Sequence, residues 1–416
     1  MHTSRGVVTD PIMQLIQTDV TIFGPTANCL DGILTRIERP APCTQQTKEK
    51  PLMGNIAIVG AGNVGQAIAG HMVLLGHTVQ MFSRWEKDFE AIIANDGIDL
   101  SGEVEGHAEK PLLTTDLGEA VTGADVVIVA APAFAHAYLS EQLARVLTPE
   151  QLVVFQPSVL GSAVELTRHF ALAQRTPCLI AETATSLYTC RLRGPAQVYI
   201  GAIKQEVHLA SIPYTKTQNA LDRLHHYFGD RYVPGADTLS VGLANCNAIY
   251  HVPPAVLNIK TVEDGDALPL HTLVTPRVAE VINALDEERI ALAEALGIQT
   301  ISFWEFLASA YGVTEGSYVE RVVQGYGRQA FPEPDSLTHR YFTEDIPFGL
   351  VIWSSLAKQI GLSLPITDSF IKLSGIICGT DFEADGRTAD VLGLEGLDAA
   401  AIRTAFLDGV TSLVKS

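Results

Sequence analysis

Residues 55–65 read N-I-A-I-V-G-A-G-N-V-G, an apolar run followed by a turn that contains three glycines. Gly60, Gly62 and Gly65 have the G-x-G-x-x-G spacing of a dinucleotide-binding turn. A helical pattern over residues 66–75 and a second apolar run over 77–82 come next. Strand, turn, helix and strand thus fit within the roughly thirty residues that this motif requires. We therefore expect a Rossmann-type unit to begin here.

The glycine turn predicts the first contacts with a dinucleotide. Gly60 allows the tight turn, Gly62 lets a pyrophosphate approach the backbone, and Gly65 lets helix and strand pack closely. Asn63 and Val64 lie in the same turn, and the free N–H groups at the start of the following helix face the phosphates. The alternative is a glycine-rich turn in an ordinary α/β domain, but the flanking strand and helix favour cofactor binding.

The end of the second strand bears on which dinucleotide binds. An NAD site usually has an acidic residue here, which binds the ribose hydroxyls, whereas this chain has Ser83 and Arg84. A hydroxyl beside a fixed cation favours a 2′-phosphate, so we predict NADP (NADPH), with NAD also possible. In the alternative interpretation, Arg84 is solvated and both cofactors bind. Pro132 ends a later apolar strand at the cofactor edge and completes the expected contacts.

The remaining pattern divides the chain into three parts. Apolar strand patterns continue to about residue 212, and the runs 198–202 and 206–212 are typical of a closing pair of strands. From residue 237 onward long helical patterns dominate, among them 239–257, 276–296 and 365–378. We therefore predict an α/β fold with an N-terminal extension over 1–52, a Rossmann domain over 53–236 and an all-α helical domain over 237–416.

Composition limits the classes of partner. The chain has 28 basic and 47 acidic residues, a net charge of −19, which argues against nucleic acid and against an anionic membrane surface. Its six cysteines are scattered without a C-x-x-C pair, a distribution that favours free thiols over disulfides or a metal site. No apolar run is long enough to span a membrane, and the start has no secretory pattern. We expect a cytoplasmic protein.

Residues 1–52 precede the first Rossmann strand, and Met53 stands two residues before it. A Rossmann domain usually begins within a few residues of its first strand. We expect the extension to be a disordered leader, a small appendage, or sequence upstream of a true start at Met53.

Two later segments contain polar side chains in apolar surroundings. Asn247 and His251 are four residues apart, hence on one face of a helix. Taken alone, such a histidine is more often bonded to a backbone carbonyl than catalytic. Asp345 precedes an apolar helix, where it can cap the helix or pair with a histidine.

Three motifs together resemble the opine dehydrogenases, the octopine/nopaline dehydrogenase family. They are E-T-x-x-S-x-x-T-C-R at 182–191, N-x-N-A-x-x-H at 245–251 and R-Y-F-x-E-D-x-x-x-G-L-V at 340–351. Asp368, Asp381 and the run 386–388 follow in the family's order. The resemblance extends from about residue 54 to the end of the chain.

The resemblance implies a reaction and a set of site residues. In that family a 2-oxo acid and the amino group of an amino acid form an imine, which NAD(P)H reduces. The histidine–aspartate dyad falls on His251 and Asp345, the carboxylate-binding arginine on Arg340, and an active-site asparagine on Asn247. The sequence departs from the family by having H-V-P where H-P is common, and by having Ser83 where NAD-using members have an acid.

Two other functions remain open from the sequence. A ketopantoate-reductase-like enzyme would reduce a 2-oxo acid to a 2-hydroxy acid, but it favours a catalytic lysine, which the segments around His251 and Asp345 do not contain. A non-catalytic NADP sensor would keep the glycine motif without needing a His–Asp pair. We expect small-molecule substrates of unassigned identity, no metal, and a homodimer as one possible assembly.

Overall fold

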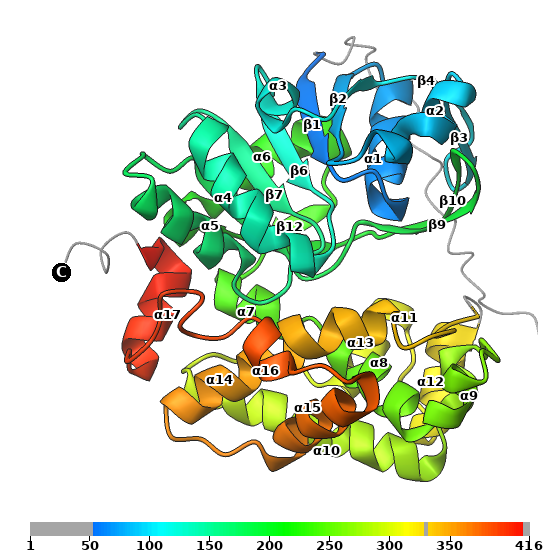
Figure 1. Ribbon diagram of the computed structural model, residues 1–416, viewed down its shortest axis with the longest axis vertical. Helices are drawn as coiled ribbons and strands as arrows, with labels where there is room; N and C mark the ends of the chain where they lie inside the picture. The colour runs from blue at the N-terminus through cyan, green and yellow to red at the C-terminus, as the bar shows by residue number, and fades with distance from the viewer. Residues whose placement is uncertain (1–52, 328–331, 411–416) are drawn as a thin grey trace, which may run out of the picture. The chain divides into compact units, whose positions relative to one another are not determined.

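The fold is seen in a computed structural model, which describes residues 53–327 and 332–410 (Figure 1). The N-terminal extension expected over 1–52 lies outside the described residues. The described chain begins with β1 (Asn55–Val59), α1 (Asn63–Leu74) and β2 (Thr78–Phe82), and β1 pairs with β2 in parallel. The βαβ unit predicted around the three glycines is therefore present.

Eight strands of the described chain form one sheet, in the order β12-β11-β8-β7-β6-β1-β2-β5. Neighbouring strands run parallel, except that β11 runs antiparallel to β8. The chain leaves β1 toward β2 on one side and returns to β6 on the other, so the strand order reverses beside β1. In open parallel sheets this switch point, at the carboxyl ends of the strands, is where a dinucleotide binds. The strands not yet bounded are β5 (Leu112–Thr114), β6 (Val126–Val129), β7 (Leu152–Phe155), β8 (Leu179–Thr183), β11 (Val207–Ile212) and β12 (Tyr232–Pro234).

Helices cover both faces of this sheet, which explains why its central strands are apolar throughout. Ala57 and Val59 of β1 face one core, which is shared with α3, α4 and α5. Ile56 and Ile58 alternate with them and face a second core, which is shared with α1 and α6. The bounds are α3 (Leu117–Val121), α4 (His136–Val146), α5 (Ser162–Leu172) and α6 (Thr217–Phe228).

A second sheet of four strands packs against α1 and has the order β4-β3-β10-β9. Its strands are β3 (Gly97–Gly102), β4 (Gly106–Glu109), β9 (Tyr188–Gly194) and β10 (Gln197–Ile203). The prediction that residues 198–202 and 206–212 form a closing pair is therefore wrong. β10 pairs with β3 and β9, whereas β11 pairs with β8 and β12 in the first sheet. The physical reason is local, because a two-residue connection makes β9 and β10 a hairpin and gives β10 its partner before β11 is reached.

The C-terminal part is helical, as predicted, and Figure 1 shows helices α8 to α16 grouped below the sheets. The predicted helix over 239–257 is divided into two helices by Ala244, Asn245 and Cys246. The helices are α7 (Thr238–Leu243), α8 (Asn247–Leu257), α9 (Ile259–Glu263), α10 (Pro276–Ala295), α11 (Phe303–Tyr311), α12 (Tyr318–Tyr326), α13 (Arg340–Thr343), α14 (Val351–Gln359), α15 (Pro365–Cys378), α16 (Phe382–Asp385) and α17 (Ala399–Asp408).

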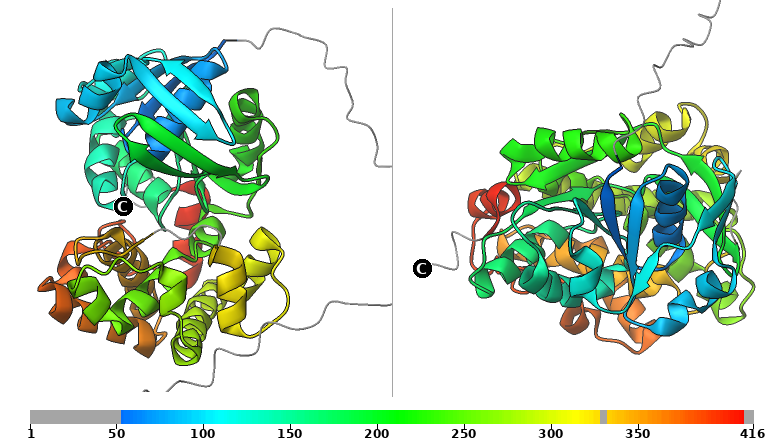
Figure 2. Two further views of the ribbon diagram at one scale, coloured as in Figure 1. Left: turned by 90° about the vertical axis from the view of Figure 1, so that its right-hand side faces the viewer. Right: turned by 90° about the horizontal axis from the view of Figure 1, so that it is seen from above.

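Two of these helices pack against the first sheet, and the first of them also contacts α10. Helix α7 contacts β8 and β11, and α17 contacts β11 and α5. Figure 2 shows α17, in red, beside the sheet-containing part. We therefore propose that the domain boundary falls after α7, and that α17 returns to the dinucleotide-binding domain. Among the described helices none is both long and apolar enough to cross a membrane.

Candidate active site

The glycine turn after β1 has a conformation that two of its three glycines make possible. Gly60 has a φ of +121°, and a side chain there would lie 2.8 Å from the Ala130 carbonyl oxygen. A Cβ at Gly65 would lie 1.9 Å from the Gly60 carbonyl oxygen, so α1 can approach the turn only without one. A Cβ at Gly62 would meet nothing within 4 Å. The first and third glycines are therefore required by the fold, and the second faces open space beside the N-terminus of α1.

That open space belongs to a cavity of about 870 Å³ along the carboxyl ends of β1, β2 and β6. Of the predicted cofactor residues, Gly65 lies outside its wall and the others line it, namely Gly60, Gly62, Asn63, Val64, Ser83, Arg84 and Pro132. Asn63 is also held in place, since its Oδ1 accepts a 2.7 Å hydrogen bond from the Leu192 N–H. The structure thus brings the predicted cofactor contacts together in one space.

The end of β2 contains a carboxylate that the sequence analysis missed. The Ser83 hydroxyl donates its hydrogen to Asp88, so it presents a lone pair rather than a free donor. Arg84 lies between the rings of Trp85 and Tyr138, with its guanidinium carbon 5.0 and 4.8 Å from their centroids. The cavity wall here therefore contains one arginine held between two aromatic rings and one aspartate.

His251 and Asp345 form the pair that the family resemblance implies. The His251 Nδ1 lies 2.7 Å from the Asp345 Oδ2, and the side chains are 15% and 5% exposed. An ionised carboxylate only accepts hydrogen bonds, so the Nδ1 carries the proton and the Nε2 remains for a substrate. Asp345 stands directly before a π-helical turn at Ile346–Leu350, and His251 lies in the middle of α8. Two separate elements therefore fix the geometry of the pair.

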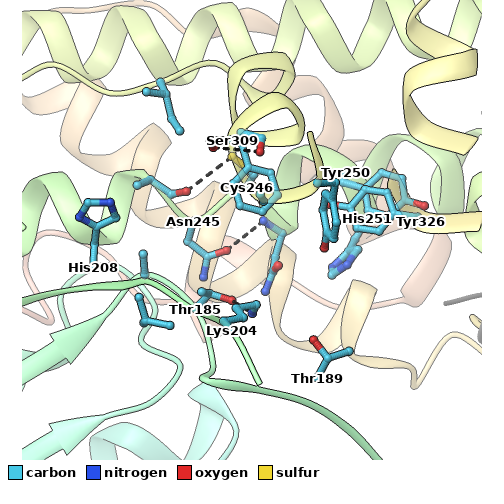
Figure 3. Close-up of a pocket in the computed structure, with 18 of the residues that line it drawn as sticks. Thr185, Thr189, Lys204, His208, Asn245, Cys246, Tyr250, His251, Ser309 and Tyr326 are labelled. Atoms are coloured by element: carbon cyan, nitrogen blue, oxygen red, sulfur yellow. Dashed lines mark hydrogen bonds between the residues drawn. The ribbon is translucent and has the colours of Figure 1, made fainter. Parts of the chain in front are cut away.

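His251 lines a second cavity, of about 370 Å³, enclosed between the sheets and the helices (Figure 3). Tyr341 stacks on the imidazole with ring centroids 4.1 Å apart, and Tyr250 stacks on Tyr326 at 4.2 Å. Together with Phe306 and Tyr311 these rings form an aromatic wall on the helical side. The opposite side contains polar residues of β9 and of the loops after β8 and β10, including Thr185, Thr189, Arg191 and Lys204. We refer to this space as the His251 cavity.

Arg340 lies beside the dyad in sequence but lines the other cavity. It lines the cavity of about 870 Å³ beside the glycine turn, which we refer to as the cofactor cavity, whereas its neighbour Tyr341 lines the His251 cavity. The Arg340 Nε is 3.0 Å from the Glu344 Oε2, and the Glu344 Oε1 accepts a 2.9 Å bond from the Ala133 N–H. Glu344 therefore holds the arginine and connects α13 to the loop after β6. Glu344 belongs to the 340–351 motif, but the sequence did not indicate a role for it.

Asn247 lines the His251 cavity at the first position of α8. Its backbone N–H donates to the Asn245 Oδ1 at 2.9 Å, while the Asn245 Nδ2 donates to the Ser158 carbonyl at 3.1 Å. Such side-chain bonds compete with helical ones, which is why the helix breaks here. Asn245 thus connects the sheet to the helix that carries Asn247 and His251.

A cluster around Glu333 was also missed by sequence reasoning. Its carboxylate accepts bonds from Arg191 at 2.9 Å, from His339 at 3.1 Å and from the Tyr341 hydroxyl at 3.1 Å. Burial alone would raise the pKa of Glu333, but the bond to His339 and the charge of Arg191 outweigh it and lower the pKa to about 2. Glu333 is therefore a permanent anion that fixes the ring stacked on His251.

Comparison with known proteins identifies the families that this chain resembles. The model of the alpha-helical domain of NAD/NADP octopine/nopaline dehydrogenases matches residues 234–378, and that of ketopantoate reductase PanE/ApbA matches residues 56–210. The opine dehydrogenase of Arthrobacter sp. (strain 1C) is 33% identical over 84% of this chain and 98% of its own length. Protein ocs of Agrobacterium tumefaciens (strain Ach5) is 28% identical over 86% of this chain and 100% of its own length.

Solved structures show the same fold. An octopine dehydrogenase solved with NADH and L-arginine has a TM-score of 0.71 at 20% identity, covering 85% of this chain and 98% of its own. A yersinopine dehydrogenase with NADP⁺ bound has a TM-score of 0.63 at 15% identity, covering 84% of this chain and 97% of its own. These likenesses confirm a Rossmann-type domain followed by a helical domain. With an opine dehydrogenase 33% identical over nearly its whole length, the chain belongs to the opine dehydrogenase family.

Proposed function

We propose that this oxidoreductase uses NADPH to reduce the imine formed from a 2-oxo acid and the amino group of an amino acid. His251 and Asp345 would act as the acid/base pair. The observation that supports this most is a juxtaposition in the structure. The His251–Asp345 pair faces one cavity, and Arg340, adjacent to the ring that stacks on His251, lines the neighbouring cavity beside the glycine turn.

The residues present fit a nicotinamide dinucleotide. Gly62 leaves room for a pyrophosphate, and the free N–H groups at the start of α1 suit its charge. When bound, the reduced cofactor supplies the hydride. The two solved relatives, with NADH and with NADP⁺, support this class of cofactor.

A preference for NADPH rests on Arg84. Its guanidinium is held between two rings at the cavity wall, where it can pair with a 2′-phosphate. Asp88 lies in the same wall and accepts the Ser83 hydrogen, so its negative charge opposes the phosphate. We therefore propose that NADPH is preferred and that NADH is still used.

His251 would donate and accept the protons of the reaction. Condensation of amine and ketone releases water, and the imine must be protonated before it accepts hydride. A protonated imidazole can give a proton from its Nε2 to the leaving hydroxyl. Asp345 fixes the tautomer and stabilises the imidazolium.

Arg340 would bind the carboxylate of the 2-oxo acid. Its Nε is occupied by Glu344, so the two terminal nitrogens are left for a bidentate contact. Because Arg340 lines the cofactor cavity, the 2-oxo acid would lie on the nicotinamide side of the dyad. Asn247 would contact the substrate from the start of α8.

The test is NADPH oxidation at neutral pH with pyruvate or 2-oxoglutarate, with and without a panel of amino acids. Oxidation that needs both partners is the expected result. Oxidation with the oxo acid alone would instead indicate the ketopantoate-reductase-like alternative, which the family match over residues 56–210 favours. Tight NADPH binding without turnover for any pair would contradict both and leave the sensor hypothesis.

A further inference from the structure

A lysine that the sequence analysis assigned no role lies in the wall of the His251 cavity. Lys204 directly follows β10, and Figure 3 shows it beside Thr185 and below Asn245. Its ammonium group donates to the Thr185 hydroxyl and to the Ser186 carbonyl, both at 2.7 Å. Both acceptors are uncharged, so two of the three N–H groups are oriented without neutralising the charge.

Two other cations at the cavity walls, Arg191 and Arg340, each have a carboxylate partner. Arg191 is paired with Glu333 at 2.9 Å, and Arg340 with Glu344 at 3.0 Å. Among the described residues, no carboxylate forms an ion pair with Lys204. Of the acids in the same wall, Glu333 is occupied by three donors and Glu206 is exposed.

A cation removed from water without a counter-ion is costly. Burial lowers the pKa of Lys204 to about 8, and the nearby Cys190 raises it only in part. At neutral pH, Lys204 is therefore still charged in most molecules of the protein. An anionic ligand in the cavity would supply the missing partner and stabilise the charged form.

The proposed reaction provides such an anion. The imine between a 2-oxo acid and an α-amino acid carries one carboxylate on each side of its C=N bond. Two cationic sites are therefore needed, on opposite sides of the reacting atoms. Arg340 lines the cofactor cavity and Lys204 the His251 cavity.

We propose that Lys204 is a substrate-binding residue that receives the α-carboxylate of the amino donor. The donor side chain would then extend to the aromatic wall of Tyr250, Phe306, Tyr311 and Tyr326. The substrate class is an α-amino acid with an uncharged, apolar side chain. The inference rests on the proposed opine-forming function and adds the site and class of its amino donor.

The first test compares wild-type protein with pairs of donors that differ only in the carboxylate, such as phenylalanine with phenethylamine and leucine with isoamylamine. We expect each amino acid to have a kcat/KM at least ~30-fold above its amine, because a lost charge-assisted contact costs at least about 2 kcal/mol. Equal use of the amine would overturn the proposal, and this comparison needs no variant.

The second test is Lys204→Met, with Lys204→Arg as the conservative variant. Lys204→Met should raise the donor KM by ~30-fold or more, with the pyruvate KM and the NADPH Kd within about twofold, and Lys204→Arg should recover most of the donor affinity. Lys260→Met is the matched control, since that lysine is exposed and pairs with Asp264 on α9. For phenethylamine, the Lys204→Met substitution should have no effect.

The outcomes separate this proposal from the function on which it rests. If the Lys204→Met variant still makes opine with an unchanged donor KM, the proposed role of Lys204 is wrong but the proposed function stands. A loss of kcat at unchanged donor KM also overturns the proposed role of Lys204, because that result indicates a proton-transfer role. If wild-type protein forms no opine from any pair, the proposed function fails, and the donor site fails with it.

Discussion

Two histidine–carboxylate pairs lie on either side of Tyr341, and they differ in what else their carboxylates bind. His251 pairs with Asp345 at 2.7 Å, and His339 pairs with Glu333 at 3.1 Å. Tyr341 stacks on the first imidazole and meets the second edge-on, with centroids 4.1 and 4.3 Å away. A simple search for His–acid pairs would therefore find both.

The surroundings decide which pair can do acid–base chemistry. Glu333 is held by Arg191, His339 and Tyr341, whereas the Asp345 side chain, within the described residues, is bonded to His251 alone. His251 lines a cavity, and His339 is absent from the walls of both cavities in the described part of the chain. A pair whose carboxylate has three donors and whose histidine lies outside the cavity walls fixes structure. A pair with a free imidazole nitrogen at a cavity can transfer protons.

The largest expected effect tests this difference directly. His251→Asn should lower kcat by at least ~10²-fold, the usual cost of removing an acid–base group, while NADPH still binds. The matched change His339→Asn should alter kcat by less than about fivefold. Steady-state kinetics and NADPH titration of both variants measure this. Equal losses in the two variants would remove the distinction between the pairs.

The Asp345→Asn substitution should cause the second-largest loss of kcat. The amide keeps the shape but no longer stabilises an imidazolium, so we expect kcat to fall by roughly 10–10²-fold. A kcat like that of wild type would show that Asp345 takes no part in the acid–base step.

Arg84→Ala tests the cofactor end of the site. We expect the Kd of NADPH to rise by about 10-fold or more and that of NADH by less than about threefold, since the arginine would pair only with the 2′-phosphate. Asp88→Asn should act oppositely and strengthen NADPH binding. Fluorescence titration with both cofactors measures this, and equal effects on NADPH and NADH would refute the phosphate contact.

Glu344→Gln should give a smaller, selective effect. Glutamine can still accept the Ala133 N–H but loses the charge that holds the Arg340 Nε. We expect the KM of the 2-oxo acid to rise by about 5–10-fold at nearly unchanged kcat. Glu383→Gln, which removes an exposed partner of Lys358, is the control. A matching loss in Glu383→Gln would attribute the effect to general stability.

The smallest prediction concerns stability rather than activity. The pKa of Glu333 is lowered to about 2 in the folded protein, so its contribution is present above the ordinary value near 4.5 and is lost as pH falls toward 2. The difference in unfolding free energy between wild type and Glu333→Gln should be at most on the order of 3 kcal/mol at pH 7. It should shrink from about pH 5 downward in urea titrations. A difference independent of pH would show that Glu333 is not held as an anion.

The parts of the molecule that sequence predicts well are those encoded locally. The glycine turn, α1 and the apolar strands follow from spacing and periodicity over a few residues. His251 and Asp345 are 94 residues apart, and their pairing followed from the family resemblance rather than from any local pattern.

The parts that sequence could not predict depend on which segments meet. The second sheet needs β3 to pair with β10, about a hundred residues later. Lys204, Glu333 and Asp88 became candidates because folding brings them to the walls of the two cavities. No spacing rule connects such residues in the sequence.

The most direct test of the central claim is to trace nitrogen into the product. The full chain is incubated with NADPH, pyruvate and a ¹⁵N-labelled apolar amino acid, and the products are analysed by mass spectrometry. Opine formation predicts a product that retains ¹⁵N and has the summed mass of both substrates less one oxygen. Lactate as the reduced product, with all ¹⁵N left in the free amino acid, would contradict it.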